Sequence, residues 1–266
     1  MSVAAFDANE QDMGTIIGCN KDAGTAISRD CIDLMPQAFK LAATGGEAMS
    51  DDDLPEDSKL TKSKSRWAEL GKFLTGMVSR PEDSRLPPGQ HLVKTWPILD
   101  LGQTPNVPKE VWRLDIVGLV DKPQTWTWTN LMAQQQTQKL SDIHCVTSWS
   151  RYDNHWDGVT THDLLEAVQP RPEARFVLLS SNDGYTTNMA IEDFASPEAI
   201  IAHSWEGEPL TLDHGGPVRL VVPHLYFWKS PKWLKRIEFA AADHPGFWEV
   251  RGYHNHGDPW TEERYS

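Results

Sequence analysis

Cys145 lies in SDIHCVTSW (residues 141–149) and is the one cysteine of this 266-residue chain outside its polar N-terminal region. The stretch before it predicts a strand that ends near Cys145, ahead of a polar and irregular segment. A strand end that faces a loop is a common place for a reactive group. A thiolate there could act as a nucleophile or bind a soft metal, whereas position alone favours a packed, buried cysteine.

Basic and small residues are combined in HGGPVRLVVPHLYFWKSPKW (residues 214–233). His214 and Arg219 flank two glycines and a proline, which could bend the backbone so that both side chains reach one ligand. Ser230 and Lys232 follow an apolar strand pattern, and a phosphate requires arginine, lysine, serine and backbone N–H groups. The same residues also fit a hairpin turn followed by solvated surface charges, so both interpretations stay open.

Two further stretches carry polar groups that could bind a ligand. Asp183, in SSNDGYTTN (residues 180–188), could accept hydrogen bonds from an amino-bearing ligand, although Asp-Gly is also a typical hairpin turn. His254 and His256 would share one face of a strand and could bind zinc. A lone H-x-H without further ligands nearby favours ordinary packing of the aromatic C-terminal segment instead.

Short strands and helices must position these groups. Strands are predicted for WRLDIVGLV (112–120), RFVLLSS (175–181) and PVRLVVP (217–223). TTHDLLEAV (160–168) predicts a helix capped by Thr160. Strands and helices do not alternate regularly, which favours an α+β fold over a doubly wound sheet. No G-x-G-x-x-G follows a strand, so a nicotinamide or flavin Rossmann site is not expected.

The composition changes near residue 65. All 12 tryptophans lie at Trp67 or later, whereas residues 1–65 are acidic and rich in turn-forming residues. We therefore expect residues 1–65 to be a largely disordered acidic tail, with a short helix near 32–42. Residues 66–266 are expected to form one domain, which is long enough to bury a full core.

Charge and cysteine content exclude several classes of protein. The net charge of −13 disfavours binding to nucleic acid or anionic membranes, although KSPKWLKR (229–236) could be a local anion site or a solvated helix face. Three cysteines cannot ligate an iron–sulfur cluster, and no C-x-x-C-H offers haem attachment. The chain shows no secretory or twin-arginine pattern and no long apolar run, which predicts a cytoplasmic protein without a membrane span.

Four motifs in order resemble the molybdopterin-binding domain of the sulfite oxidase family, and most closely its small prokaryotic members. The motifs are DIHCVTSWS, NDGYTTN, HGGPVRLVVPHLYFWKSPKWLKRIEF and GFWEVRGYHNHGDPW. The resemblance implies that family's strand-rich α+β fold and an oxidoreductase that transfers an oxygen atom to or from a small substrate. Its cofactor would be molybdenum bound by molybdopterin. Electrons would pass to or from a separate carrier or redox partner protein.

The resemblance also implies roles for single residues. Cys145 would ligate the molybdenum, because a soft thiolate suits a metal that changes oxidation state during oxygen transfer. Asp183 would meet the pterin, and a further pterin contact is expected within residues 95–100. The pterin and its phosphate would be held by the two basic segments through His214, Arg219, Ser230, Lys232 and the carbonyl of Pro231.

The chain departs from sulfite oxidases just after the cysteine. Those enzymes continue with Gly-Asn-Arg, whose arginine helps to bind sulfite, whereas the first arginine after Cys145 here is Arg151. The sequence therefore supports no sulfite-binding arginine cluster and leaves the substrate open. Trp149, Trp156 and Trp228 could instead wall an aromatic substrate pocket, although core packing explains tryptophans equally well.

Three alternatives to this enzyme stay open. The first is a hydrolase with Cys145 as nucleophile and His144, His155 or His214 as its base. The second is a non-catalytic module that binds the pterin or only its phosphate. The third is a zinc protein that uses the paired histidines near the C-terminus.

Overall fold

The computed structural model describes residues 59–69 and 85–266. The tail predicted for residues 1–58, with its short helix near 32–42, lies outside the described residues. Residues 59–65, which we expected to belong to the tail, form the first part of helix α3 (Lys59–Glu69). The domain boundary expected near residue 65 therefore falls inside a helix.

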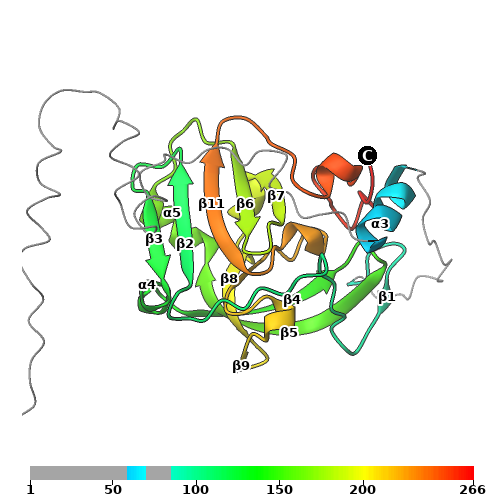
Figure 1. Cartoon of the computed structure of the whole chain (residues 1–266), viewed down its shortest axis with the longest axis horizontal. Coiled ribbons are helices and arrows are strands. Elements are labelled where there is room, and N and C mark those ends of the chain that lie inside the picture. Colours follow the sequence, from blue (N-terminus) through cyan, green and yellow to red (C-terminus); the bar gives the residue numbers. More distant parts are fainter. Residues whose placement is uncertain (1–58, 70–84) are drawn as a thin grey trace, which may run out of the picture. The chain divides into compact units, whose positions relative to one another are not determined.

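Within the described part of the chain, the strands form two mixed sheets (Figure 1). One sheet has six strands in the order β1-β5-β8-β10, with β4 paired to β5 and β9 to β8. Its strands are β1 (His91–Leu92), β4 (Thr137–His144), β5 (Trp149–Thr160), β8 (Ile200–Trp205), β9 (Glu208–Pro209) and β10 (Arg219–Val221). The β1 and β5 strands pair in parallel, and the other pairs of this sheet are antiparallel.

The second sheet has five strands in the order β3-β2-β11-β6-β7 (Figure 1). Its strands are β2 (Arg113–Gly118), β3 (Gln124–Thr127), β6 (Phe176–Ser181), β7 (Thr186–Ala190) and β11 (Leu234–Ala240). Only β2 and β11 pair in parallel here. The remaining elements are short helices: α4 (Trp128–Ala133), α5 (Thr161–Val168), α6 (Ile191–Phe194), and the 3₁₀ turns η3 (Leu212–His214), η4 (Phe227–Lys229) and η5 (Glu249–Arg251). Mixed sheets with short helices confirm the predicted α+β class.

Local sequence explains where these elements begin. The predicted strands at 112–120, 175–181 and 217–223 contain β2, β6 and β10. Helix α5 starts directly after Thr160, whose hydroxyl accepts a hydrogen bond from the N–H of Asp163 at 3.1 Å. KSPKWLKR does not form one helix face, because its second half enters strand β11.

Residues of the six-stranded sheet pack into a buried cluster on each of its two faces, and one of these clusters contains Cys145. Along β8, Ile201 points into the main core that joins both sheets, whereas Ile200 and Ala202 point into a second cluster on the opposite face. Alternate residues of a strand face opposite sides, so one strand supplies both clusters. The second cluster is rich in aromatic residues and contains Cys145. No helix in the described residues is long and apolar enough to cross a membrane.

Candidate functional site

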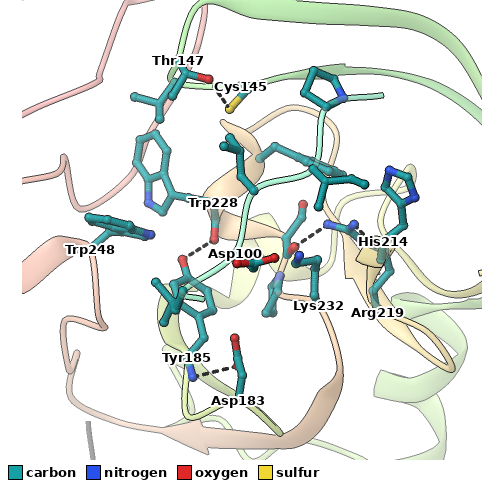
Figure 2. A pocket seen from close by; sticks show the side chains of 18 of the residues that line it. Asp100, Cys145, Thr147, Asp183, Tyr185, His214, Arg219, Trp228, Lys232 and Trp248 are labelled. Carbon is teal, nitrogen blue, oxygen red and sulfur yellow. Dashed lines mark hydrogen bonds between the residues drawn. The ribbon is translucent and has the colours of Figure 1, made fainter. Parts of the chain in front are cut away.

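A pocket opens beside the aromatic cluster, between loops that are far apart in the sequence (Figure 2). The pocket and its mouth together hold about 900 Å³ of space not filled by protein atoms. All seven predicted site residues belong to its lining, which also contains aromatic and aliphatic residues. The predicted residues on this lining are Cys145, Asp183, His214, Arg219, Ser230, Pro231 and Lys232.

Cys145 is presented by a tight turn between β4 and β5. Its N–H donates to the carbonyl of Trp149 at 2.8 Å, and Ser148, with a left-handed φ of 74°, donates its N–H to the Cys145 carbonyl at 3.0 Å. Gln90 holds the same carbonyl through its side-chain amide at 3.1 Å. Cys145 as a whole is only 6% exposed, and its Sγ lies 3.1 Å from the hydroxyl oxygen of Thr147. The turn therefore fixes the backbone while Sγ faces the pocket (Figure 2).

Arg219 is a buried cation held entirely by backbone oxygens. Its guanidinium donates to the carbonyls of His214 at 2.9 Å and Ser230 at 2.8 Å, and it lies over the Phe227 ring. No carboxylate among the described residues pairs with it, and burial lowers the pKa of Arg219 to about 9. A buried charge without a counter-charge is costly, so this guanidinium is prepared for an anion.

Lys232 and Asp183 add one cationic and one acidic group to the pocket. Lys232 donates its ammonium to the carbonyl of Asp213 at 2.9 Å. Burial, with the nearby Arg219 charge, lowers the pKa of Lys232 to about 8. Burial raises the pKa of Asp183, although its Oδ1 accepts the N–H of Tyr185 at 3.0 Å. The pocket can therefore bind both an anion and a hydrogen-bond donor.

His214 stacks on Trp96 with ring centroids 4.0 Å apart, and its two ring nitrogens contact the hydroxyl of Thr211 and the carbonyl of Trp96. Burial lowers the pKa of His214, which favours the neutral ring. Residues 96–101 line the pocket, where a pterin contact was expected within 95–100. The glycines before Arg219 do not line the pocket; a Cβ at Gly215 would meet Lys232 at 2.8 Å, so this glycine allows close packing of the chain on itself.

Ser230 and Pro231 line the pocket but also support the loop. The hydroxyl of Ser230 accepts the N–H of Val222 at 2.9 Å, which leaves its hydrogen for another acceptor. The carbonyl of Pro231 accepts the N–H of Leu220 at 3.0 Å. That carbonyl, which we expected to face the pterin, fixes the loop with one of its two lone pairs, and its role toward the pterin stays a prediction.

The tryptophans and basic residues grouped by sequence separate in the structure. Trp149 and Trp228 line the pocket, whereas Trp156 is buried in the cluster behind it. Lys229 forms a buried ion pair with Glu249 and does not reach the pocket, so of KSPKWLKR only the part around Lys232 meets the pocket.

Several residues of the lining were not predicted from the sequence. Tyr185 follows Asp183 within NDGYTTN, so its place in that motif was an available signal. Trp248 and Tyr253 come from the fourth motif and carried only a packing interpretation. Lys64 of α3 also lines the pocket, and no motif surrounds it.

The geometry does not assemble a thiol–histidine pair. Within the described residues, Cys145 Sγ contacts Thr147 and no histidine nitrogen. His144 Nδ1 contacts the Ser150 hydroxyl at 2.9 Å, and burial lowers the pKa of His144 to about 4. His155 is exposed on β5, and the two ring nitrogens of His214 contact Thr211 and Trp96 rather than the thiol. The hydrolase alternative therefore lacks its base in this arrangement.

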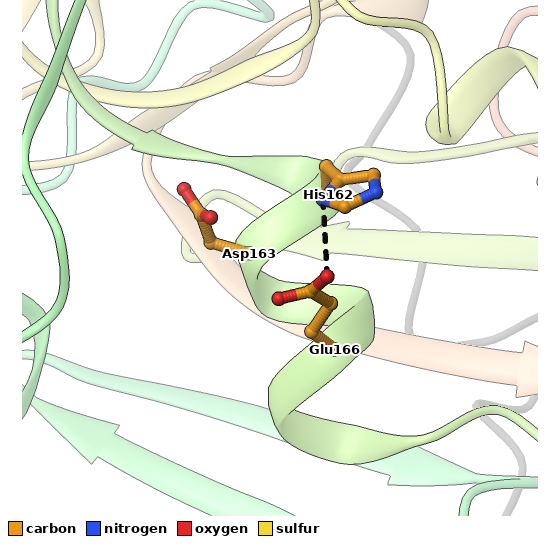
Figure 3. Close-up of side chains that lie close together, drawn as sticks. All are labelled: His162, Asp163 and Glu166. Carbon is orange, nitrogen blue, oxygen red and sulfur yellow. Dashed lines mark ion pairs between the residues drawn. The ribbon is translucent and has the colours of Figure 1, made fainter.

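The candidate zinc ligands lie outside the pocket. His254 and His256 both contact Glu263 Oε2, at 3.3 and 2.7 Å, and neither lines the pocket. A different group in the described chain, on helix α5, brings three ligand atoms within 4.8 Å of one another (Figure 3). Its members are His162, Asp163 and Glu166. Asp163 is used in capping the helix, and His162 and Glu166 are exposed, so this group is an ordinary helix surface.

Comparisons with known proteins agree with the site. Residues 101–248 match the family described as oxidoreductase molybdopterin binding domain. The chain is 43% identical over 186 residues to the uncharacterized oxidoreductase YuiH of Bacillus subtilis, covering 70% of this chain and 94% of that protein. It is 27% identical over 161 residues to the protein-methionine-sulfoxide reductase catalytic subunit MsrP of Campylobacter jejuni, covering 54% of each chain.

A solved structure shares the fold. The sulfane dehydrogenase SoxCD of Paracoccus pantotrophus superimposes with a TM-score of 0.53 at 16% identity, covering 85% of this chain and 66% of that chain. The family match spans more than half of this chain, and molybdenum held by molybdopterin is the cofactor that it implies. The chain therefore belongs to the molybdopterin-binding oxidoreductases of the sulfite oxidase type.

Proposed function

We propose that this chain is a molybdenum-cofactor enzyme that transfers an oxygen atom to or from a small substrate. The observation that carries the proposal is that one pocket contains both the Cys145 thiol and Arg219, whose buried guanidinium has no carboxylate partner in the described residues. A thiolate is a soft ligand for a metal, and an uncompensated guanidinium suits a phosphate. The metal and the phosphate are the two ends of the molybdenum–molybdopterin cofactor.

The other residues of the pocket fit the same group. Arg219 and Lys232, with His214 beside them, would hold the phosphate end, and Ser230 would donate its hydroxyl hydrogen there. Asp183 would accept hydrogen bonds from amino groups of the pterin. The indole N–H of Trp149 is buried without a partner in the described chain and supplies one more donor.

The bound cofactor would supply two-electron chemistry coupled to the gain or loss of one oxygen atom. The protein would supply a shielded space beside Cys145. Trp228 is fixed there from both ends, because its indole N–H donates to Glu249 at 3.0 Å and its carbonyl accepts the Tyr185 hydroxyl at 2.6 Å. A rigid aromatic wall limits water and the size of the substrate.

Electrons would be exchanged with a separate carrier or partner protein. Three cysteines in the whole sequence are too few for an iron–sulfur cluster that is held by four cysteines. Relatives named as reductase subunits, from Azospira oryzae and Campylobacter jejuni, support a partner, although the chain spans only 54% of each. A cytoplasmic location stays a prediction, which fractionation of expressing cells would check.

The proposal is tested by turnover with isotopically labelled water. The enzyme, expressed with its cofactor, would be assayed on a panel of sulfoxides, N-oxides and inorganic oxyanions with an artificial electron donor, and on the corresponding deoxygenated compounds with an artificial electron acceptor. We expect oxygen from labelled water in the oxidised product, loss of turnover in Cys145→Ser, and normal turnover in Lys235→Met, since Lys235 is exposed on β11. Fully loaded protein with no turnover in either direction would instead favour a non-catalytic pterin-binding module.

A further inference from the structure

Helix α3 supplies a cation to the pocket. Thr61 and Lys64 are three residues apart and therefore lie on one face of the helix, and both line the pocket. The helix contacts η5 of the C-terminal segment, and Figure 1 shows it beside that segment. The helix is thus placed by the same segment that contributes Trp248 and Tyr253 to the lining.

Lys64 is a half-buried ammonium without an acidic partner. Its Nζ lies 6.0 Å from the centre of the Trp248 ring, and it makes no hydrogen bond or ion pair with the described residues. Burial lowers the pKa of Lys64, and the thiolate form of Cys145 is the charged group that opposes this effect. Lys64 and Cys145 both line the pocket, together with the Trp248 ring that the ammonium lies over.

Lys64 is separate from the cations assigned to the phosphate. Figure 2 shows Trp228 and Trp248 on one side of the pocket, and Lys232, Arg219 and His214 on the other. Lys64, over Trp248, belongs to the tryptophan side. A positive charge bordered by aromatic rings attracts an anion more strongly than the same charge in water.

The first arginine after Cys145 does not supply this charge. Arg151 pairs with Glu206 at 3.1 Å, contacts Asn154 and lies over the Trp205 ring, and it does not line the pocket. The cation beside the thiol comes instead from a helix about 80 residues earlier in the chain.

We propose that Lys64 forms an anion subsite beside Cys145, and that the substrate is a small molecule with an oxyanion or carboxylate group. This inference deepens the proposed function and rests on it for the identity of the bound molecule as substrate. The presence of the subsite itself is testable without molybdenum.

The test compares two alkylating reagents on full-length protein expressed without cofactor. Iodoacetate and iodoacetamide both transfer a carbon to the thiolate with loss of iodide, but only iodoacetate is an anion. The rates of alkylation at Cys145 are measured by peptide mass spectrometry. Both rates are proportional to the fraction of thiolate, so their ratio is independent of it and reports how strongly the site attracts an anion. Cys19 and Cys31 give internal reference ratios in the same sample.

We expect Lys64→Met to lower the iodoacetate-to-iodoacetamide ratio at Cys145 about fivefold, as loss of one nearby charge in a partly shielded site implies. Lys64→Arg keeps a permanent charge and should keep the ratio. Lys62→Met removes an exposed lysine of the same helix and should leave the ratio unchanged. Thermal unfolding would confirm that each variant is folded.

An unchanged ratio in folded Lys64→Met would overturn the subsite, and so would an equal fall in Lys62→Met. Because this readout needs no metal, it is independent of the proposed enzyme activity. If the rate ratio falls in Lys64→Met but the wild type never binds molybdenum, the anion subsite stands and the proposed function is refuted.

Discussion

The buried ion pair behind the pocket gives a prediction whose size follows from the structure. Lys229 Nζ lies 2.7 Å from Glu249 Oε1, and the two side chains are 0% and 1% exposed. The ammonium also donates to the backbone carbonyl of Asn188 at 2.8 Å. Replacing Lys229 with methionine would leave the Glu249 carboxylate buried without its cation. Breaking a buried pair in this way costs about 3–5 kcal/mol.

The same carboxylate oxygen also accepts hydrogen bonds from the Thr187 hydroxyl at 2.8 Å and the Trp228 indole at 3.0 Å. Loss of the Lys229 ammonium should therefore weaken the positioning of Trp228 beside Cys145 as well as destabilise the fold. For a domain of this size, about 3–5 kcal/mol corresponds to a fall in melting temperature of roughly 6–20 °C.

Urea and thermal unfolding of the wild type and four variants would measure the effect: Lys229→Met, Glu249→Gln, the double variant and Lys235→Met. Lys229→Met should lose about 3–5 kcal/mol, and the double variant Lys229→Met with Glu249→Gln should lose clearly less than the sum of the two single changes. Lys235→Met, which removes an exposed lysine from the same basic stretch, should stay within about 0.5 kcal/mol of the wild type. A loss below about 1 kcal/mol in Lys229→Met, or strict additivity in the double variant, would refute this reasoning.

Three further predictions concern the pocket. Arg219→Met should reduce retention of the pterin roughly 10- to 150-fold, because one charge-assisted hydrogen bond contributes about 1.5–3 kcal/mol. Pterin fluorescence after dialysis would measure the retention. Retention equal to that of the wild type would contradict the assignment of Arg219 to the phosphate. The pKa of Lys232, about 8 in the folded protein, predicts that pterin retention falls as pH rises through 8, because the neutral amine no longer attracts phosphate. In the cofactor-free protein the free energy of unfolding should instead rise between pH 8 and 10.5, because in this range only the unfolded chain keeps the proton on the Lys232 amine. Lys232→Arg should abolish both pH trends. Gly257→Ala should destabilise the fold by about 1–3 kcal/mol in urea, because φ is +86° and the added Cβ would lie 2.8 Å from the Trp228 ring; a loss under about 0.5 kcal/mol would show that the ring moves freely.

Much of the strand pattern was predictable because it rests on local alternation of apolar residues. The strand ending before Cys145, the capped helix after Thr160 and the strands β2, β6 and β10 all follow this rule. Motif order also predicted which loops meet, since each predicted site residue lines one pocket. Their roles toward the cofactor stay predictions.

What could not be predicted depends on tertiary packing. Lys229 and Lys232 are three residues apart in one basic run, but only the fold decides that Lys229 faces Glu249 and Lys232 faces the pocket. Trp149 and Trp156 belong to the same aromatic cluster, but only Trp149 lines the pocket, and no local pattern distinguishes them. The position of Lys64 follows from the docking of α3 on the C-terminal segment, which no local pattern encodes.

Molybdenum content tests the central claim most directly. Wild type and Cys145→Ser would be expressed in a host that makes the cofactor and compared by metal mass spectrometry and visible absorption. We expect near-stoichiometric molybdenum in the wild type, and in Cys145→Ser an altered thiolate-to-metal absorption band. Well-folded wild-type protein without molybdenum or pterin, or a variant whose absorption band is unchanged, would contradict the assignment of Cys145 as the metal ligand.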